Sequence, residues 1–108
     1  MIRHSLRIIT LHRGRHEKKR RVIRFTDPKY HLLALFINAE ADSFRREIYA
    51  AFEQAETEGE GFFAGNLTTL SIHDGIAELC SQLDEEQVPL LIEAKELEAL
   101  LSEWYSKR

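Results

Sequence analysis

The dipeptide Asp74-Gly75 is the feature that most constrains the fold of this chain, because it separates two runs in which apolar and polar residues alternate. A two-residue type I′ turn needs positive φ at both central positions, and Asp and Gly adopt that conformation at low cost. The turn predicts an antiparallel hairpin that pairs His73 with Ile76 and Leu70 with Leu79. The aliphatic residues of one face, which we expect to pack on the core, are Leu70, Ile72, Ala77 and Leu79.

Residues 76–83 also fit a helix. Ile76, Leu79, Cys80 and Leu83 recur at helical spacing, and Asp74 is able to cap the first turn. Period alone does not separate a short strand from a short helix in such a run, so both interpretations stand, with the hairpin first. After the hairpin we expect a third strand at Val88–Ile92.

Two stretches have clear helical periodicity. The first, Asp42–Thr57, has Asp42 or Ser43 as a cap and is stopped by Gly59 and Gly61. The second is Ala94–Tyr105, in which we expect Trp104 to pack in the core. The apolar stripes are Phe44, Ile48, Ala51, Phe52 and Ala55 in the first helix, and Leu97, Leu100, Leu101 and Trp104 in the second.

The amino-terminal part predicts another hairpin. Leu6–Leu11 and Val22–Phe25 are rich in β-branched residues, whereas His12–Arg21 is a charged run that we interpret as a long solvated loop at the hairpin tip. The next apolar run, Tyr30–Ile37, fits either a buried strand or a short core helix that begins at Asp27 and Pro28, and we favour the strand.

Together these segments predict a single α+β domain spanning residues 1–108, in which two helices pack on a single-layer antiparallel sheet of four or five strands. The chain has no apolar run long enough to cross a bilayer, and Ser5–His12 is too short and interrupted for the apolar part of an export signal. One cysteine excludes an intramolecular disulfide, which fits a reducing compartment. We therefore expect a cytoplasmic protein.

The charges are divided along the sequence. Residues 1–24 hold nine Lys and Arg against one Glu, a net charge of +8, while residues 25–108 hold six against seventeen acids, a net charge of −11. Such a division indicates a charged partner or two faces that meet each other. One interpretation of the basic part is a nucleic-acid-binding accessory domain, although no aromatic residue is interleaved for base stacking. Its phosphate-binding residues would be Arg13, Arg15, Lys18, Lys19, Arg20 and Arg21.

The sequence contains no motif typical of catalysis, cofactor binding or a metal centre. His12 and His16 have the spacing of a metal-binding pair on a helix, but they stand among cations that repel a metal ion. Cys80 lies in a strand-like segment, where a lone cysteine is more typical of a small buried residue than of a nucleophile. The glycines form no phosphate-binding loop. We therefore expect a non-enzymatic protein with no cofactor and no metal.

Two acidic clusters border the predicted hairpin and offer a surface for a basic protein. Clustered carboxylates accelerate encounter with a cationic partner and mimic a polyanion, which suits inhibition of a nuclease. The predicted partner-binding residues are Glu56, Glu58 and Glu60 in the first cluster, and Asp84, Glu85 and Glu86 in the second.

The carboxy-terminal layout resembles that of a known family. A short meander is followed by Val88–Leu97 and by a last helix that reads Leu100-Leu101-Ser-Glu-Trp104. Over roughly the last 45 residues, the layout is similar to that of small immunity proteins of bacterial contact-dependent and other polymorphic toxin systems. The resemblance implies a non-enzymatic cytoplasmic protein that binds one cognate toxin, commonly a nuclease, and blocks its active site or its access to a partner.

Overall fold

The computed structural model describes residues 2–106, apart from the side chain of Arg13, and confirms the α+β class. Its strands form two antiparallel sheets, the first of which is a ribbon of β1 (His4–Arg13) and β2 (His16–Phe25). The second has four strands in the order β3 (Glu60–Ala64), β4 (Thr68–His73), β5 (Ile76–Ser81) and β6 (Leu90–Glu93). The helical segments are η1 (Pro28–Tyr30), α1 (His31–Phe36), η2 (Ile37–Ala41), α2 (Arg45–Glu58) and α3 (Ala94–Ser106).

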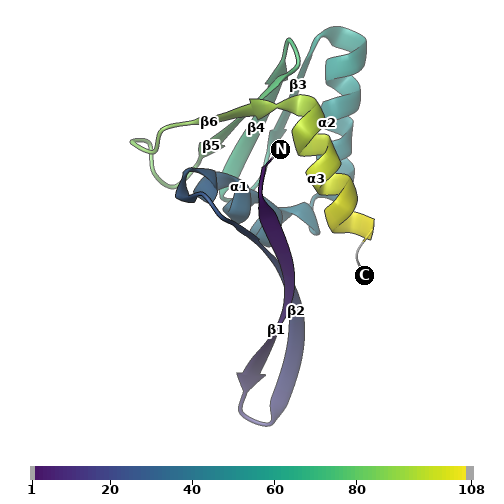
Figure 1. Ribbon diagram of the computed structural model, residues 1–108. Helices are drawn as coiled ribbons and strands as arrows, with labels where there is room; N and C mark the ends of the chain where they lie inside the picture. The colour runs from purple at the N-terminus through teal and green to yellow at the C-terminus, as the bar shows by residue number, and fades with distance from the viewer. Residues whose placement is uncertain (1, 107–108) are drawn as a thin grey trace.

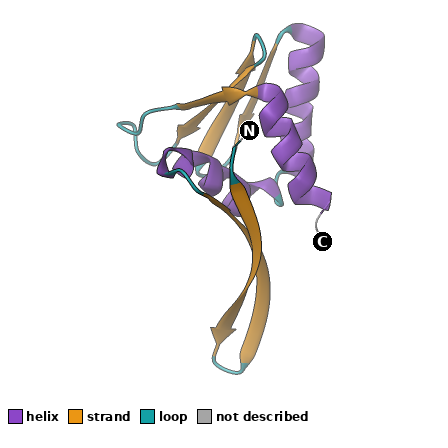
Figure 2. Cartoon of the chain, in the orientation of Figure 1, coloured by secondary structure: helices purple, strands orange, loops and turns teal. Residues whose placement is uncertain are grey.

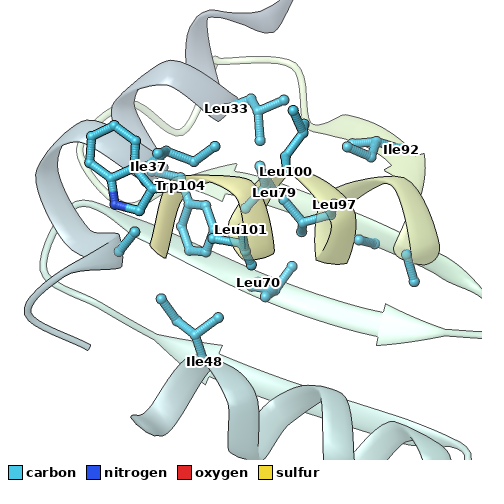
Figure 3. Close-up of a cluster of buried hydrophobic side chains, with 14 of the residues drawn as sticks. Leu33, Ile37, Ile48, Leu70, Leu79, Ile92, Leu97, Leu100, Leu101 and Trp104 are labelled. Atoms are coloured by element: carbon cyan, nitrogen blue, oxygen red, sulfur yellow. The ribbon is translucent and has the colours of Figure 1, made fainter. Parts of the chain in front are cut away.

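The helices cover one face of the four-stranded sheet, and the ribbon projects away from this body (Figures 1 and 2). The ribbon accounts for the elongated outline, with principal extents of 49, 31 and 26 Å. Inside the body, side chains of α3 such as Leu97 and Leu101 meet Leu70 and Leu79 of the sheet (Figure 3). A single-layer sheet with packed helices therefore describes the body, whereas the separate ribbon makes that description only approximate for the whole chain.

The β4–β5 hairpin has the predicted turn and register. Asp74 and Gly75 have φ angles of 51° and 76°, as a type I′ turn requires. His73 pairs with Ile76, and the predicted aliphatic face is buried. The alternative helix over residues 76–83 is wrong, because β5 is hydrogen-bonded between β4 and β6.

Both predicted helices are present and bury their apolar stripes. Gly59 ends α2 in the left-handed conformation, with φ of 87°. The predicted caps are wrong, since α2 is preceded by Phe44, which makes no side-chain capping hydrogen bond. Asp42 instead accepts a hydrogen bond of 2.9 Å from the indole N–H of Trp104, whose side chain is buried as predicted.

Strand β3 lies where the sequence predicted no element, and the last strand begins later than predicted. In β3, Gly61 and Phe63 point toward the core while Glu60 and Phe62 point outward. Gly61 lies so close to α2 that any Cβ there would collide with the carbonyl of Ala51. The last strand begins at residue 90 and not 88, after a proline that has no N–H to donate to a ladder.

The predicted amino-terminal hairpin is confirmed, but the prediction of a long solvated loop at its tip is wrong. Strand pairing continues as far as Arg13 and His16, so only Gly14 and Arg15 form the turn. Gly14 has φ of 59°, the left-handed conformation that a two-residue hairpin needs at its first central position. The outer part of the ribbon has water on both faces and needs no apolar alternation, so its charged residues lack the pattern that predicts a strand.

Residues 30–37 are helical, so the prediction of a buried strand there is wrong. The Asp27 carboxylate accepts a hydrogen bond of 3.0 Å from the Lys29 N–H, and Pro28 occupies the first helical position. This is the start that the helical alternative required. Between residues 31 and 41 only His31 and Ala39 are exposed, so the helix is enclosed nearly all round and its sequence reads as a continuous apolar run.

The π-helical segment η2 attaches the ribbon to the body through Asn38. Its side-chain oxygen accepts a hydrogen bond of 2.7 Å from the Ile23 N–H, and its amide nitrogen donates one of 3.0 Å to the Ile23 carbonyl. In a wider sheet, a neighbouring strand would bond the N–H and the carbonyl of Ile23. The Asn38 side-chain amide makes these two hydrogen bonds in its place. We call this contact the Asn38 clamp.

The same segment holds the β3–β4 turn through Glu40, which is 1% exposed. Its carboxylate accepts hydrogen bonds from the backbone N–H groups of Asn66, Leu67 and Thr68, at 2.6, 3.1 and 2.8 Å, and from the Thr68 hydroxyl at 2.6 Å. A Cβ at Gly65 would strike this carboxylate, so the turn requires glycine there. We call this arrangement the Glu40 lock.

Candidate functional site

The face of the four-stranded sheet that points away from the helices carries exposed apolar side chains. Phe62 is 58% exposed, Leu91 is 62% exposed and Ile76 is 42% exposed. We call the outward side chains of β3 to β6 the open face. Exposed aromatic and aliphatic side chains gathered on one sheet face are typical of a surface that another molecule covers.

The strand register orders the open face into rows. One row consists of Phe62, Ser71, Glu78 and Leu91, and the next consists of Glu60, His73, Ile76 and Glu93. The outward positions of these four strands therefore include three glutamates and no Lys or Arg. The His73 Nε2 atom lies 3.3 Å from Glu60 Oε1 and the Nδ1 atom lies 3.2 Å from Asp74 Oδ2. The open face is thus both apolar and negative.

The two predicted acidic clusters lie at opposite ends of this sheet. Glu56 and Glu58 are in the last turn of α2, and Glu60 begins β3, at the end where β4 turns into β5. Asp84, Glu85 and Glu86 are in the connection between β5 and β6, at the other end. All of them are exposed, but the structure does not bring the clusters together. Of the six, Glu60 alone has its side chain on the open face.

The connection that holds the second cluster is shaped by its own hydrogen bonds. The Ser81 hydroxyl oxygen accepts from the N–H groups of Leu83 and Asp84, each at 3.1 Å. The Asp84 carboxylate accepts from the Glu86 N–H at 3.0 Å. Leu83 and Val88 are strongly exposed in the same connection, so this end combines carboxylates with apolar side chains as the open face does.

The predicted nucleic-acid residues follow one another along the outer ribbon. Arg15 is in the turn, and the others are in β2 except Arg13, which ends β1 and whose side chain lies outside the described part. Lys18, Lys19 and Arg20 are exposed. In the described part of the chain, the ion pair of Arg21 with Asp42, at 4.0 Å, is the only one that joins a Lys or Arg of the ribbon to a carboxylate. The ribbon therefore presents largely uncompensated positive charge.

A cavity of about 400 Å³ lies where the ribbon leaves the body. We call it the basal pocket. Its cations come from three successive residues of β2 and from the first residue of α2. The lining residues are Ile8, Lys19, Arg20, Arg21, Asp42, Arg45 and Tyr105.

Two of these arginines are held against aromatic rings. The Arg21 guanidinium lies 4.1 Å from the centre of the Trp104 ring, and that of Arg45 lies 4.6 Å from the Tyr105 ring. Burial raises the pKa of the Tyr105 hydroxyl, which donates a hydrogen bond of 2.6 Å to the Ala41 carbonyl. These cation–π contacts restrain the positions of the two guanidinium groups.

The other sequence candidates for chemistry show no activated group. Burial and the Glu78 carboxylate raise the pKa of the Cys80 thiol, which disfavours the nucleophilic thiolate. His12 and His16 lie on different strands, near the ribbon tip, and not on one helix face. Among residues 2–106, no group of three His, Cys, Asp or Glu side chains is placed to hold a metal ion.

Sequence reasoning missed the apolar part of the open face and the basal pocket. Alternation in β3 was a usable signal, because Gly61 and Phe63 on one side and Phe62 on the other fit a strand. The pocket had no such signal, since it joins residues of β1, β2, α2 and α3 that are far apart in the sequence.

Compared with protein-family models, with curated proteins and with solved structures, the chain gives no match. None of the described helices is long and apolar enough to span a membrane.

Proposed function

We propose that this chain is a non-enzymatic inhibitor of the immunity type, which binds a basic toxin domain in the cytoplasm through the open face. The observation that carries the proposal is an uncovered sheet face on which Phe62 and Leu91 are exposed beside three carboxylates. The resemblance of the carboxy-terminal layout to immunity proteins supports it, because β4, β5, β6 and α3 belong to that part of the chain.

The two kinds of side chain have different tasks in such a complex. Phe62 and Leu91 supply desolvated anchors, which usually dominate the binding free energy at protein interfaces. Glu60, Glu78 and Glu93 oppose the cations with which a nuclease holds phosphate, and together with the acidic clusters at the two ends they accelerate encounter. The inhibitor would thus occupy the toxin's phosphate-binding surface.

The apolar anchors are tested with the basic toxin domain encoded next to the gene for this chain. Cells that express that domain should grow when the wild-type chain is co-expressed and should stop growing with the double variant Phe62→Asp, Leu91→Asp. We expect its dissociation constant to rise by about 100-fold or more. Ile8→Asp is the matched control, since Ile8 is 72% exposed but lies on the ribbon. Equal protection by both variants would refute the open-face proposal.

The electrostatic part is tested by association rates. Glu78→Lys with Glu93→Lys should lower the association rate by about 10-fold at low salt, and the difference should shrink as salt is added. Reversal of Asp84, Glu85 and Glu86 to Lys should act in the same direction. The control is Glu47→Lys with Glu53→Lys, two exposed positions of α2 with the same change of charge. A control that slows association as much would show that net charge alone is responsible.

A second candidate function is nucleic-acid binding by the ribbon, favoured by its projection from the body and its uncompensated cations. A two-stranded ribbon fits the major groove of DNA, where Lys and Arg contact phosphates. We expect binding of a labelled duplex at about 50 mM salt, with a log–log salt slope that becomes smaller when Arg15 and Lys18 are replaced by Ala. No binding at this salt concentration would exclude the ribbon as a nucleic-acid arm.

A further inference from the structure

The residues that line the basal pocket include four cations and a single acid. Lys19, Arg20 and Arg21 come from β2, and Arg45 comes from the start of α2. The carboxylate is that of Asp42, which is itself bound by the Trp104 indole. The lining therefore has a net charge of +3, in a cavity of about 400 Å³ with apolar walls from Ile8 and Tyr105.

One donor at this pocket, on Arg21, has no hydrogen-bond partner within the described residues. The side chain of Arg21 is 18% exposed, yet within the described residues its Nε atom is buried without a hydrogen-bond partner. Its closest carboxylate oxygen, on Asp42, is 4.0 Å away, which is beyond hydrogen-bond reach. A mostly buried guanidinium normally has partners for its five donors, because an unpaired buried donor is costly.

The arginines are also arranged in advance of any ligand. Arg21 lies over the ring of Trp104 and Arg45 over that of Tyr105, while Arg20 donates a hydrogen bond of 2.6 Å to the Asn38 carbonyl. Little side-chain entropy remains to be lost when a ligand binds between them. Guanidinium groups fixed in this way suit a tetrahedral oxyanion, which accepts several N–H bonds at once.

From these observations we infer that the basal pocket binds a phosphate group. The inference does not depend on the immunity proposal, and it deepens the nucleic-acid alternative by naming where one backbone phosphate is held. The same chemistry is offered by a free nucleotide and by a nucleic-acid backbone. Lys18 and Arg15, farther along the ribbon, extend the positive surface beyond the pocket and favour the backbone as the source.

The single Trp of the chain gives the test a local reporter, because Trp104 touches both Arg21 and Asp42 of the pocket. Its fluorescence is followed while inorganic phosphate is added to the full chain, with chloride at equal ionic strength as the reference. We expect a saturable change with a dissociation constant on the order of 1 mM, and none with chloride. A phosphate response that does not exceed that of chloride would overturn the inference.

A matched pair of double variants assigns the site. Lys19→Gln with Arg45→Gln removes two pocket cations and should weaken phosphate binding by at least about fivefold. Arg24→Gln with Arg46→Gln removes the same charge from other exposed residues of the same strand and helix, which do not line the pocket, and should leave binding unchanged. All four positions are exposed, so the variants should fold like the wild type. Equal losses in the two pairs would refute the pocket as the site.

The source of the phosphate is decided by two further ligands, a nucleoside diphosphate and a 16-base-pair duplex. If the backbone is the ligand, the duplex binds more tightly than the diphosphate, and Lys19→Gln with Arg45→Gln weakens the duplex more than the control pair does. If the diphosphate binds at least as tightly as the duplex, the pocket is a nucleotide site. A duplex affinity that is equally sensitive to both pairs would leave the ribbon as a nucleic-acid arm and remove the pocket from its contact surface.

Discussion

Two hairpins of this chain close with two-residue turns and lie in opposite surroundings. The β4–β5 hairpin turns at Asp74-Gly75 and the ribbon at Gly14-Arg15, each with positive φ at the first central residue. One face of β4–β5 is buried under helices, whereas Ile23 is the only buried residue among the described side chains of the ribbon. The turn therefore determines which residues pair, and the burial of side chains determines how much the hairpin contributes to stability.

This contrast also separates the two candidate surfaces. The open face belongs to a sheet whose opposite face is packed, so its side chains are presented on a firm support. An isolated two-stranded hairpin is marginally stable in water, so the outer ribbon gains order when a ligand neutralises its cations. A preorganised face suits tight binding of one protein, and a charged arm suits a polyanion.

The largest effect should come from the Glu40 lock, which stabilises the four-stranded body. Glu40→Gln keeps the shape but removes the charge that four donors share, and it should lower the free energy of unfolding by about 3 kcal/mol. Urea unfolding measures this loss. Glu47→Gln, an exposed change on α2, should stay within about 0.5 kcal/mol of the wild type. A similar small loss for Glu40→Gln would mean that the lock is not a main support.

The Asn38 clamp should have the next largest effect, because it joins the two regions. Asn38→Ala leaves the N–H and carbonyl of Ile23 without partners and should cost about 2 kcal/mol. Asn38→Asp keeps the acceptor for the N–H but sets a carboxylate oxygen against the Ile23 carbonyl oxygen, so it should not recover the lost stability. Amide exchange at Ile23 reports the clamp directly, and unchanged protection in Asn38→Ala would contradict it.

The difference in stability between the β4–β5 hairpin and the ribbon is tested by one substitution made in both turns. Gly75→Ala and Gly14→Ala meet the same difficulty, a left-handed backbone with open space around the new Cβ, which costs about 1 kcal/mol. In Gly75→Ala the cost should appear in the global free energy of unfolding. In Gly14→Ala it should appear as faster amide exchange in the outer ribbon, with the global value nearly unchanged. Equal global losses would show that the ribbon unfolds together with the body.

The smallest effect concerns the joint between the ribbon base and α3. Burial opposes protonation of His4, but its hydrogen bond of 2.9 Å to Glu103 helps to raise the pKa of the ring above the ordinary 6.5. The interaction of protonated His4 with Glu103 makes its full contribution to stability below the ordinary pKa of the ring. This contribution is lost as the pH rises through the raised pKa. His4→Gln should therefore cost on the order of 0.5 kcal/mol at about pH 5.5 and less at about pH 8.5. A pH-independent difference in urea unfolding would contradict the ion pair.

The sequence allowed prediction where local chemistry and tertiary packing agree. Asp74-Gly75 fixed the β4–β5 register because only one pairing buries the aliphatic face, and Gly59 marked the end of α2. Predictions from the sequence were wrong where a segment is buried on all sides or exposed on all sides. Residues 30–37 are enclosed on nearly every side and lose their helical period, and the outer part of the ribbon is exposed to water on both faces and loses its alternation.

The candidate sites were predictable to a smaller extent. Exposed acids are visible in a sequence, but their distance depends on strand direction, which places Glu56 and Glu85 at opposite ends of the sheet. The basal pocket requires Lys19 and Arg45 to meet through a connection built by η1, α1 and η2. No local pattern in either segment encodes that meeting.

The Glu40 lock also bears on the order in which the chain folds. Its carboxylate is separated by 26 to 28 residues from the groups that it accepts from, so the contact requires a long loop to close first. Until those N–H groups arrive, burying the charge is unfavourable. The η2 segment and the β3–β4 turn should therefore reach their final positions together and late. Kinetically, Glu40→Gln should accelerate unfolding while the folding rate changes little, so that the lock acts chiefly as a brake on unfolding.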